Sequence, residues 1–191
     1  MTEEIKPGYT RVTEIFKQWD RYGAKGIDAA IVAKKGILGT SVHEAIDRYL
    51  NGVPPEIVKA TLTDKAMPYF ESFLQWNDTV KPLYIEKEQR LYDDDMMITG
   101  KFDAIVQFPY SEEKCLVDYK TSAAEDVKLW PLQAMFYYYL AEKNKRVVSR
   151  RFIFLQLDRE GDFPKVYEYK FSEPLWRVCQ AAWMCYRYLN S

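Results

Sequence analysis

The period of the hydrophobic pattern changes in the middle third of the sequence, and this change constrains the fold more than any other feature. Before it, apolar residues recur with helical spacing; within it, three β-rich runs follow one another. The runs cover residues 84–92, 98–108 and 114–120. The turn-forming residues 93–95 and 109–112 between them are short enough to join antiparallel neighbours. The sequence therefore predicts an antiparallel meander of three strands.

Helical and extended segments on both sides complete the predicted order. We expect helices at residues 10–19, 40–50, 54–76, 126–143 and 174–189, and two further strands at 147–158 and 165–171. The Gly-containing residues 23–39 are predicted to form a connection, so that Thr40 or Ser41 caps the second helix. Pro68 predicts a kink or a break inside the third helix. This order is typical of a mixed α/β fold, with a central mixed sheet that contains the meander and is flanked by helices.

The composition is that of an ordinary soluble globular protein, with 48% hydrophobic and 29% charged residues. No apolar stretch reaches about 18 residues, which predicts no membrane span. The acidic N-terminal residues lack the apolar region of a secretory signal, so we expect a cytoplasmic protein. The three cysteines Cys115, Cys179 and Cys185 include no CxxC pair. They predict buried free thiols instead of disulfides or a zinc site.

The net charge of −1 does not by itself indicate nucleic-acid binding. Residues 143–151 nevertheless contain a basic stretch. Such a stretch is equally typical of a nucleic-acid-binding patch and of a solvated helix end.

The third predicted strand carries Asp118 and Lys120, which have one residue between them. Alternate side chains of a strand share a face, so this carboxylate and this ammonium should point the same way. By itself, such a pair is more typical of a structural ion pair than of a catalytic site, because Asp-x-Lys is a short and common string.

The preceding strand adds a second carboxylate. Asp103 interrupts an apolar run and precedes Asp118 by 15 residues, with the predicted turn midway between them. A hairpin would therefore bring the two carboxylates together. Two partly buried carboxylates repel each other, which raises a pKa or recruits a cation. Mg²⁺ commonly binds one or two carboxylates together with a substrate phosphate.

Four further residues are candidates for the same site. Glu88 lies on the first strand of the meander, on the predicted face of Glu86 and Arg90, where an exposed charge is the alternative. The single histidine, His43, is either a metal ligand or a structural helix residue. Gln133 and Tyr137 lie one helical turn apart and could bind phosphate, although Tyr137 is equally suited to the core.

This ordered set of motifs resembles the RecB-type branch of the PD-(D/E)XK nuclease superfamily. The motifs are Gly39-Thr-Ser-Val-His43, Glu88, Gly100-Lys-Phe-Asp103, Asp118-Tyr-Lys120 and Gln133-Ala-Met-Phe-Tyr137. Each motif is weak alone, whereas five in this order on their predicted elements are specific. Phe102 stands where the superfamily motif has proline, but Gly-x-x-Asp is the usual form in this branch. The four cysteines of the iron–sulfur relatives cannot be supplied by a chain with three.

The resemblance implies a role for each matching position. Asp103, Asp118, His43 and the main-chain carbonyl of Tyr119 would bind Mg²⁺ or Mn²⁺. Lys120 would be the catalytic lysine, with Glu88 as a supporting acid. Gln133 and Tyr137 would organise the site and the nucleic-acid backbone. We expect one nuclease domain over residues 1–191, with an N-terminal helical part at about 1–80, a catalytic core at about 81–171 and a C-terminal helix at about 172–191.

The resemblance thus implies a metal-dependent nuclease that hydrolyses DNA, as an exonuclease in recombination, repair or phage DNA metabolism. A separate helicase, recombinase or single-strand-binding protein is a possible partner, because the chain has no Gly-x-x-x-x-Gly-Lys loop of its own. Two alternatives stay open at this point. One is a sequence- or structure-selective endonuclease of the same superfamily, and the other is a catalytically silent module that binds DNA or a protein.

Overall fold

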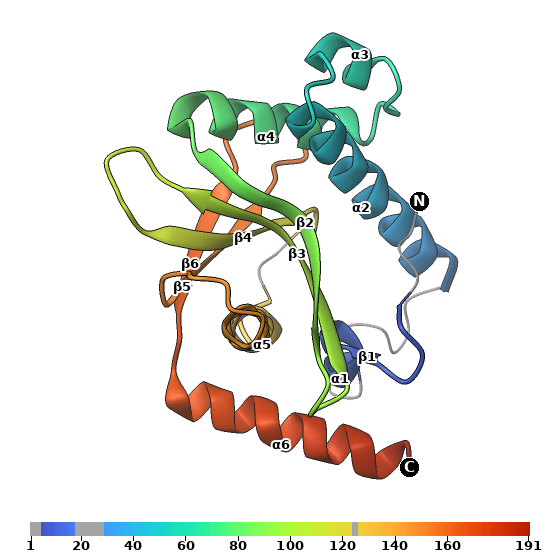
Figure 1. Ribbon diagram of the computed structural model, residues 1–191. Coiled ribbons are helices and arrows are strands. Elements are labelled where there is room, and N and C mark those ends of the chain that lie inside the picture. The colour runs from blue at the N-terminus through green and yellow to red at the C-terminus, as the bar shows by residue number, and fades with distance from the viewer. Residues whose placement is uncertain (1–4, 18–28, 124–125) are drawn as a thin grey trace.

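A computed structural model describes residues 5–17, 29–123 and 126–191. Within these residues, a six-stranded mixed sheet is flanked by helices, which confirms the predicted fold class (Figure 1). The elements in chain order are β1 (Thr10–Arg11), α1 (Val12–Lys17), α2 (Ala29–Leu50), α3 (Pro55–Lys59), α4 (Met67–Val80), β2 (Leu83–Asp93), β3 (Ile98–Gln107), β4 (Lys114–Lys120), α5 (Leu129–Lys143), β5 (Arg151–Gln156), β6 (Lys165–Lys170) and α6 (Glu173–Leu189).

The sheet contains the predicted meander of β2, β3 and β4, all paired antiparallel. The crossover through α5 then places β5 parallel to β4, and β6 returns antiparallel to β5. At the other end, the short strand β1 pairs parallel with the first residues of β3, Thr10 with Ile98 and Arg11 with Thr99. This strand was not predicted, because two residues are too few to show a two-residue alternation.

An opening in the sheet lies where β3 and β4 separate. The ladder between these strands covers residues 104–107 and 114–117 and ends at the pair Ala104 and Val117. Asp103 and Asp118 are the next residues beyond this pair. Further along, β3 pairs with β1. The predicted hairpin therefore brings its two carboxylates to the point at which the strands part.

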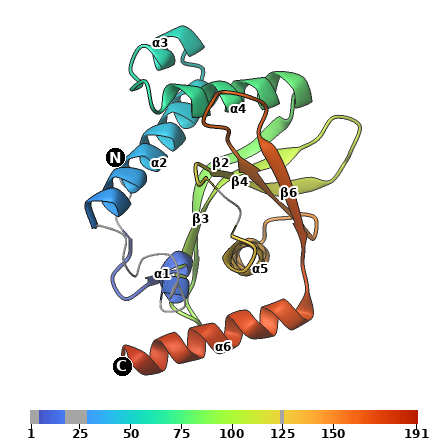
Figure 2. The same ribbon diagram turned by 180° about the vertical axis from the view of Figure 1, so that it is seen from behind.

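Helices cover both faces of the sheet, and two hydrophobic clusters result (Figures 1 and 2). On one face, Phe152 and Phe154 pack with residues of α1, α5 and α6. On the other, Val117, Tyr119 and Ile153 pack with residues of α2 and α4. Neighbouring residues of β4 and β5 thus enter different clusters, as the alternation of a strand requires. The helix α5 is apolar on most faces because it lies between the sheet and α6.

The second helix begins earlier than predicted. It starts at Ala29, so most of the predicted connection at residues 23–39 is helical, and residues 23–28 lie outside the described residues. Thr40 and Ser41 are consequently interior helix residues and not caps. The prediction was wrong because it treated glycine as a helix breaker. A glycine costs a helix only about 1 kcal/mol, and Gly39 lies so close to Thr121 that a Cβ there would come within 3.3 Å of the Thr121 Oγ1.

The break predicted near Pro68 is confirmed. The segment forms the two helices α3 and α4, and Pro68 lies in the first turn of α4. A proline is well tolerated there because its missing N–H group would have no partner in the helix. The start of α5 lies three residues after the predicted Asp126, whose side chain instead accepts hydrogen bonds from the main-chain N–H groups of Lys128 and Leu129.

Two predictions from composition can be compared with the structure. No described helix combines the length and apolarity required to cross a membrane. Cys115 and Cys179 are buried free thiols, as predicted, whereas Cys185 is exposed. The prediction for Cys185 was wrong because this residue lies on the outer face of α6, which no other described element covers.

Candidate active site

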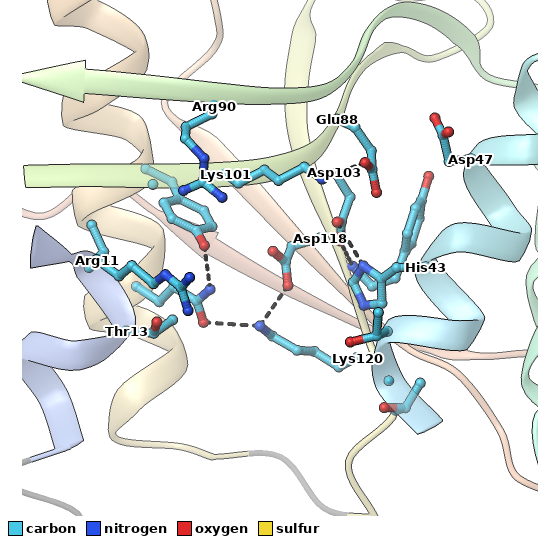
Figure 3. Close-up of a pocket in the computed structure, with 18 of the residues that line it drawn as sticks. Arg11, Thr13, His43, Asp47, Glu88, Arg90, Lys101, Asp103, Asp118 and Lys120 are labelled. Carbon is cyan, nitrogen blue, oxygen red and sulfur yellow. Dashed lines mark hydrogen bonds and ion pairs between the residues drawn. The ribbon is translucent and has the colours of Figure 1, made fainter. Parts of the chain in front are cut away.

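A cleft of about 880 Å³ lies at the opening between β3 and β4, with α2 on one side and α5 on the other (Figure 3). All eight residues that the sequence singled out line this cleft: His43, Glu88, Asp103, Asp118, Tyr119, Lys120, Gln133 and Tyr137. They come from α2, β2, β3, β4 and α5. The fold therefore brings into one cleft residues that are separated in the sequence by up to about half the length of the chain.

Asp118 and Lys120 face the same way, as the alternation predicted. The Lys120 Nζ lies 2.6 Å from the Asp118 Oδ2. Asp118 is only 4% exposed, and this burial raises the pKa of its carboxyl. The ammonium of Lys120 opposes the rise in pKa, whereas the nearby charge of Asp103 adds to it. The site thus holds a carboxylate whose ionised form the protein alone does not fully stabilise.

Two hydrogen bonds hold Asp103 in place. Its Oδ2 accepts from the main-chain N–H of Tyr119 at 2.6 Å, and its Oδ1 accepts from the Nδ1 of His43 at 2.8 Å. Burial by itself lowers the pKa of His43, but the charge and hydrogen bond of Asp103 outweigh burial and raise that pKa to about 9. Asp103 therefore links β3, β4 and α2 at one point.

A chain of hydrogen bonds connects α5 to Lys120. The Lys120 Nζ donates to the Gln133 Oε1 at 3.0 Å, and the Gln133 Nε2 donates to the Tyr137 hydroxyl at 3.0 Å. The Tyr137 ring also packs on Phe152, with ring centroids 5.8 Å apart. Tyr137 consequently belongs to both the cleft and the core, and the two readings of this residue do not exclude each other.

Glu88 lines the cleft and accepts a hydrogen bond from Lys101. It does not share its surroundings with Glu86, contrary to the prediction, because Glu86 pairs with Arg146 at 2.8 Å. Glu88 has a φ of 44°, in the left-handed region that non-glycine residues rarely adopt. This backbone conformation breaks the alternation on which the prediction depended.

The donor types in the cleft suit a hard divalent cation. Two nearly buried carboxylates, an imidazole and the main-chain carbonyl of Tyr119 are ligands that Mg²⁺ and Mn²⁺ accept. Among the described residues, however, no three His, Cys, Asp or Glu side chains already surround one common point. Lys120 pairs with Asp118 and His43 pairs with Asp103, so these two positive groups balance the charge of the two carboxylates.

Four cations of the cleft were not predicted as site residues. Arg11, Arg48, Arg90 and Lys101 line it together with the eight residues above. The two-residue spacing of Glu88 and Arg90 was the one available signal. Arg11 had none, because its position depends on the pairing of β1 with β3.

The basic stretch at residues 143–151 does not line the cleft. Lys143 pairs with Asp95 at 2.7 Å, Arg146 with Glu86 at 2.8 Å, and Arg151 with Glu168 at 2.7 Å. These ion pairs favour the structural interpretation of the stretch over a nucleic-acid-binding patch.

A family model of the PD-(D/E)XK nuclease superfamily matches residues 20–183, which is most of the chain. The chain belongs to the PD-(D/E)XK nuclease superfamily. The match includes every residue of the cleft that the sequence predicted, and the mixed sheet flanked by helices is consistent with a fold of this superfamily.

Two solved structures are similar to the chain at low sequence identity. The structure of a candidate exonuclease from Eubacterium rectale is 13% identical, with a TM-score of 0.50, and the match covers 93% of this chain and 78% of that one. The structure of SSO0001 is 17% identical, with a TM-score of 0.48, and the match covers 96% and 79%. No curated protein matches the chain. The likeness to the Eubacterium rectale structure shows the fold alone.

Gly100 explains how this superfamily member fits Tyr137 against the sheet. A Cβ at Gly100 would lie 2.7 Å from the Tyr137 Cε1 and 2.8 Å from the Leu140 Cδ1. We expect Gly100→Ala to lower the free energy of unfolding by about 1–3 kcal/mol, because the ring and the leucine must move. The displaced ring also weakens the Tyr137–Gln133–Lys120 chain, so activity should fall with stability. Urea unfolding measures the first effect.

Gly36 is a matched control for that substitution. It lies exposed in α2, and a Cβ there would meet nothing within 4 Å. Gly36→Ala should raise the free energy of unfolding by up to about 1 kcal/mol, since alanine is the better helix former. Equal stability of Gly100→Ala and the wild type would show that Tyr137 is not held in place by this contact.

Proposed function

We propose that this superfamily member hydrolyses DNA phosphodiester bonds with Mg²⁺ or Mn²⁺, as an exonuclease of the RecB-type branch. The observation that carries the proposal is the meeting of Asp103, Asp118 and Lys120 in one cleft of a chain that belongs to a nuclease superfamily. The domain proposed to do this covers residues 1–191. Its setting would be recombination, repair or phage DNA metabolism, with a helicase, recombinase or single-strand-binding protein as a separate partner.

In the proposed mechanism, Asp103, Asp118, His43 and the carbonyl of Tyr119 hold the metal. The bound ion would lower the pKa of a water molecule and act as a Lewis acid toward the phosphate. Lys120 would orient that water and stabilise the negative charge that develops on the phosphate. The Tyr119 N–H fixes one oxygen of Asp103, and the other oxygen accepts from the His43 Nδ1. For both side chains to hold the ion, His43 would release this contact and lose its proton.

Gln133 and Tyr137 have a positioning role in this proposal. Lys120 has a long flexible side chain, and two contacts, with Asp118 and with Gln133, hold its ammonium group within the cleft. Tyr137 orients the Gln133 amide through its hydroxyl. Glu88 would support the site through Lys101, with which it forms an ion pair.

The assignment as an exonuclease is tested with end-labelled DNA. With Mg²⁺, linear DNA should be degraded from its ends with little sequence preference, while circular DNA of the same sequence persists. Removal of the metal with EDTA should stop digestion, and added Mg²⁺ or Mn²⁺ should restore it, because the ion would activate the attacking water and polarise the phosphate. Single- and double-stranded forms of each substrate identify the preferred strand state.

Each alternative has its own outcome in the same experiment. Cleavage of the circular DNA would support an endonuclease, and one sharply preferred sequence would support a restriction-type enzyme. If no substrate is cut although calorimetry detects Mn²⁺ binding, the chain is a silent nuclease-like module. If no substrate is cut and no metal binds, the proposed function is wrong.

A further inference from the structure

The charges in the cleft are divided between its two sides (Figure 3). The acidic residues Asp47, Glu88 and Asp103 lie toward α2, where Arg48 of that helix and Lys101, which pairs with Glu88, also line the cleft. The guanidinium groups of Arg11 and Arg90 lie toward α5. Asp118 and Lys120 lie between the two sides. Among the described lining residues, an extended polyanion that enters the cleft therefore meets mixed charges on the α2 side and only positive charges on the α5 side.

The pairing of the strands explains why two arginines from distant positions line one side. β1 and β2 both pair with β3, which places Arg11 beside Thr99 and Arg90 beside Lys101. Arg11 is exposed, and Arg90 is half-buried. Burial raises the pKa of Tyr137, and the positive charge of Arg90 is close enough to oppose this rise. Both guanidinium groups lie on the opposite side of Asp118 from His43 (Figure 3).

We infer that Arg11 and Arg90 form a second phosphate subsite, which binds a phosphate of the DNA strand adjacent to the one that is cleaved. This inference rests on the proposed function. The planar guanidinium group matches a phosphate with two parallel hydrogen bonds. In the proposed mechanism the scissile phosphate lies at the centre of the site, beside Lys120. Among the described lining residues, the carboxylates lie at that centre or toward α2, so only the α5 side offers positive charge without a competing carboxylate. The next phosphate is therefore favoured on the arginine side, and the strand runs across the cleft from α2 toward α5.

The subsite is tested by comparing a substrate with several phosphates and one with a single phosphate. For Arg11→Gln and Arg90→Gln, kcat/KM is measured with a DNA oligonucleotide and with bis(p-nitrophenyl) phosphate. We expect the ratio of the DNA value to the small-substrate value to fall about 10- to 100-fold. A loss of this size corresponds to the binding energy of one charge-assisted hydrogen bond. The slope of log kcat/KM for DNA against log salt should also fall by about one for each arginine.

Arg177→Gln is the matched control, because Arg177 is exposed on α6 and does not line the cleft. It should change neither the ratio nor the salt slope. If Arg90→Gln does not fold, the test of the subsite depends on Arg11→Gln alone. Arg11 is exposed, so its replacement should leave the fold intact. If the small substrate is cut too slowly to measure, the salt slope decides.

Two outcomes overturn the subsite. One is an equal loss on both substrates with an unchanged salt slope, which would indicate that the arginines only stabilise the fold. The other is wild-type behaviour of both variants. A wild-type protein that cuts neither substrate would instead refute the proposed function.

Discussion

Lys120→Ala is expected to lower the rate of Mg²⁺-dependent DNA hydrolysis about 100-fold or more, the usual loss when one group that stabilises transition-state charge is removed. The ammonium group lies 2.6 Å from Asp118, in the cleft that also holds Asp103. It is therefore placed beside the reacting phosphate in the proposed mechanism. Mn²⁺ binding should persist, because both carboxylates remain. Single-turnover digestion and calorimetric titration with Mn²⁺ measure the two effects.

Lys165→Ala is the control for this variant, since Lys165 is an exposed lysine at the start of β6, outside the cleft. It should retain wild-type activity. The alternative interpretation of Lys120 is a structural ion pair with Asp118. A Lys120→Ala protein that loses stability but digests DNA at the wild-type rate would support that alternative and reject the catalytic role.

Asp118→Asn is expected to abolish both Mn²⁺ binding and DNA hydrolysis. A bound metal contributes several kcal/mol to transition-state stabilisation, so its loss should lower the rate by about 1000-fold or more. The amide keeps the shape of the side chain but removes the charge that attracts the cation. The variant should fold at least as well as the metal-free wild type, because burial disfavours the ionised form of Asp118. Calorimetry, digestion and thermal unfolding measure the three quantities.

Asp162→Asn is the matched control, because Asp162 is exposed between β5 and β6 and does not line the cleft. It should bind Mn²⁺ and digest DNA as the wild type does. Wild-type affinity of Asp118→Asn for Mn²⁺ would show that the carboxylate is not a metal ligand. Loss of digestion with retained Mn²⁺ binding would assign Asp118 to orienting Lys120 instead.

Much of the fold follows from local patterns. The two-residue period predicted β2, β3 and β4 nearly to their observed ends, and the break near Pro68 follows from the geometry of proline. The largest error concerned α2, where the Gly-containing residues 23–39 were predicted to form a connection although the helix begins at Ala29. Gly39 lies against Thr121, which is distant in the sequence. The residues around Gly39 give no sign of this contact, so a pattern read along the chain could not explain a glycine inside a helix.

Glu88 marks a second limit of prediction from sequence. Its spacing from Glu86 and Arg90 indicated one shared face, but its left-handed backbone conformation separates it from Glu86. A non-glycine residue with positive φ leaves no sign in the sequence, because the surrounding structure imposes it.

The sequence by itself determined the direction of the central side chains. Alternation places Asp118 and Lys120 on one face, and a hairpin with its turn midway brings Asp103 to Asp118. These are consequences of local geometry, in which the backbone period sets where each side chain points. Only the tertiary structure decided which other groups surround them. The pairing of β1 with β3 brings Arg11 to the cleft, and the packing of α2 and α5 brings His43 and Gln133, because contacts between distant segments depend on how whole elements pack and not on the period of any one of them.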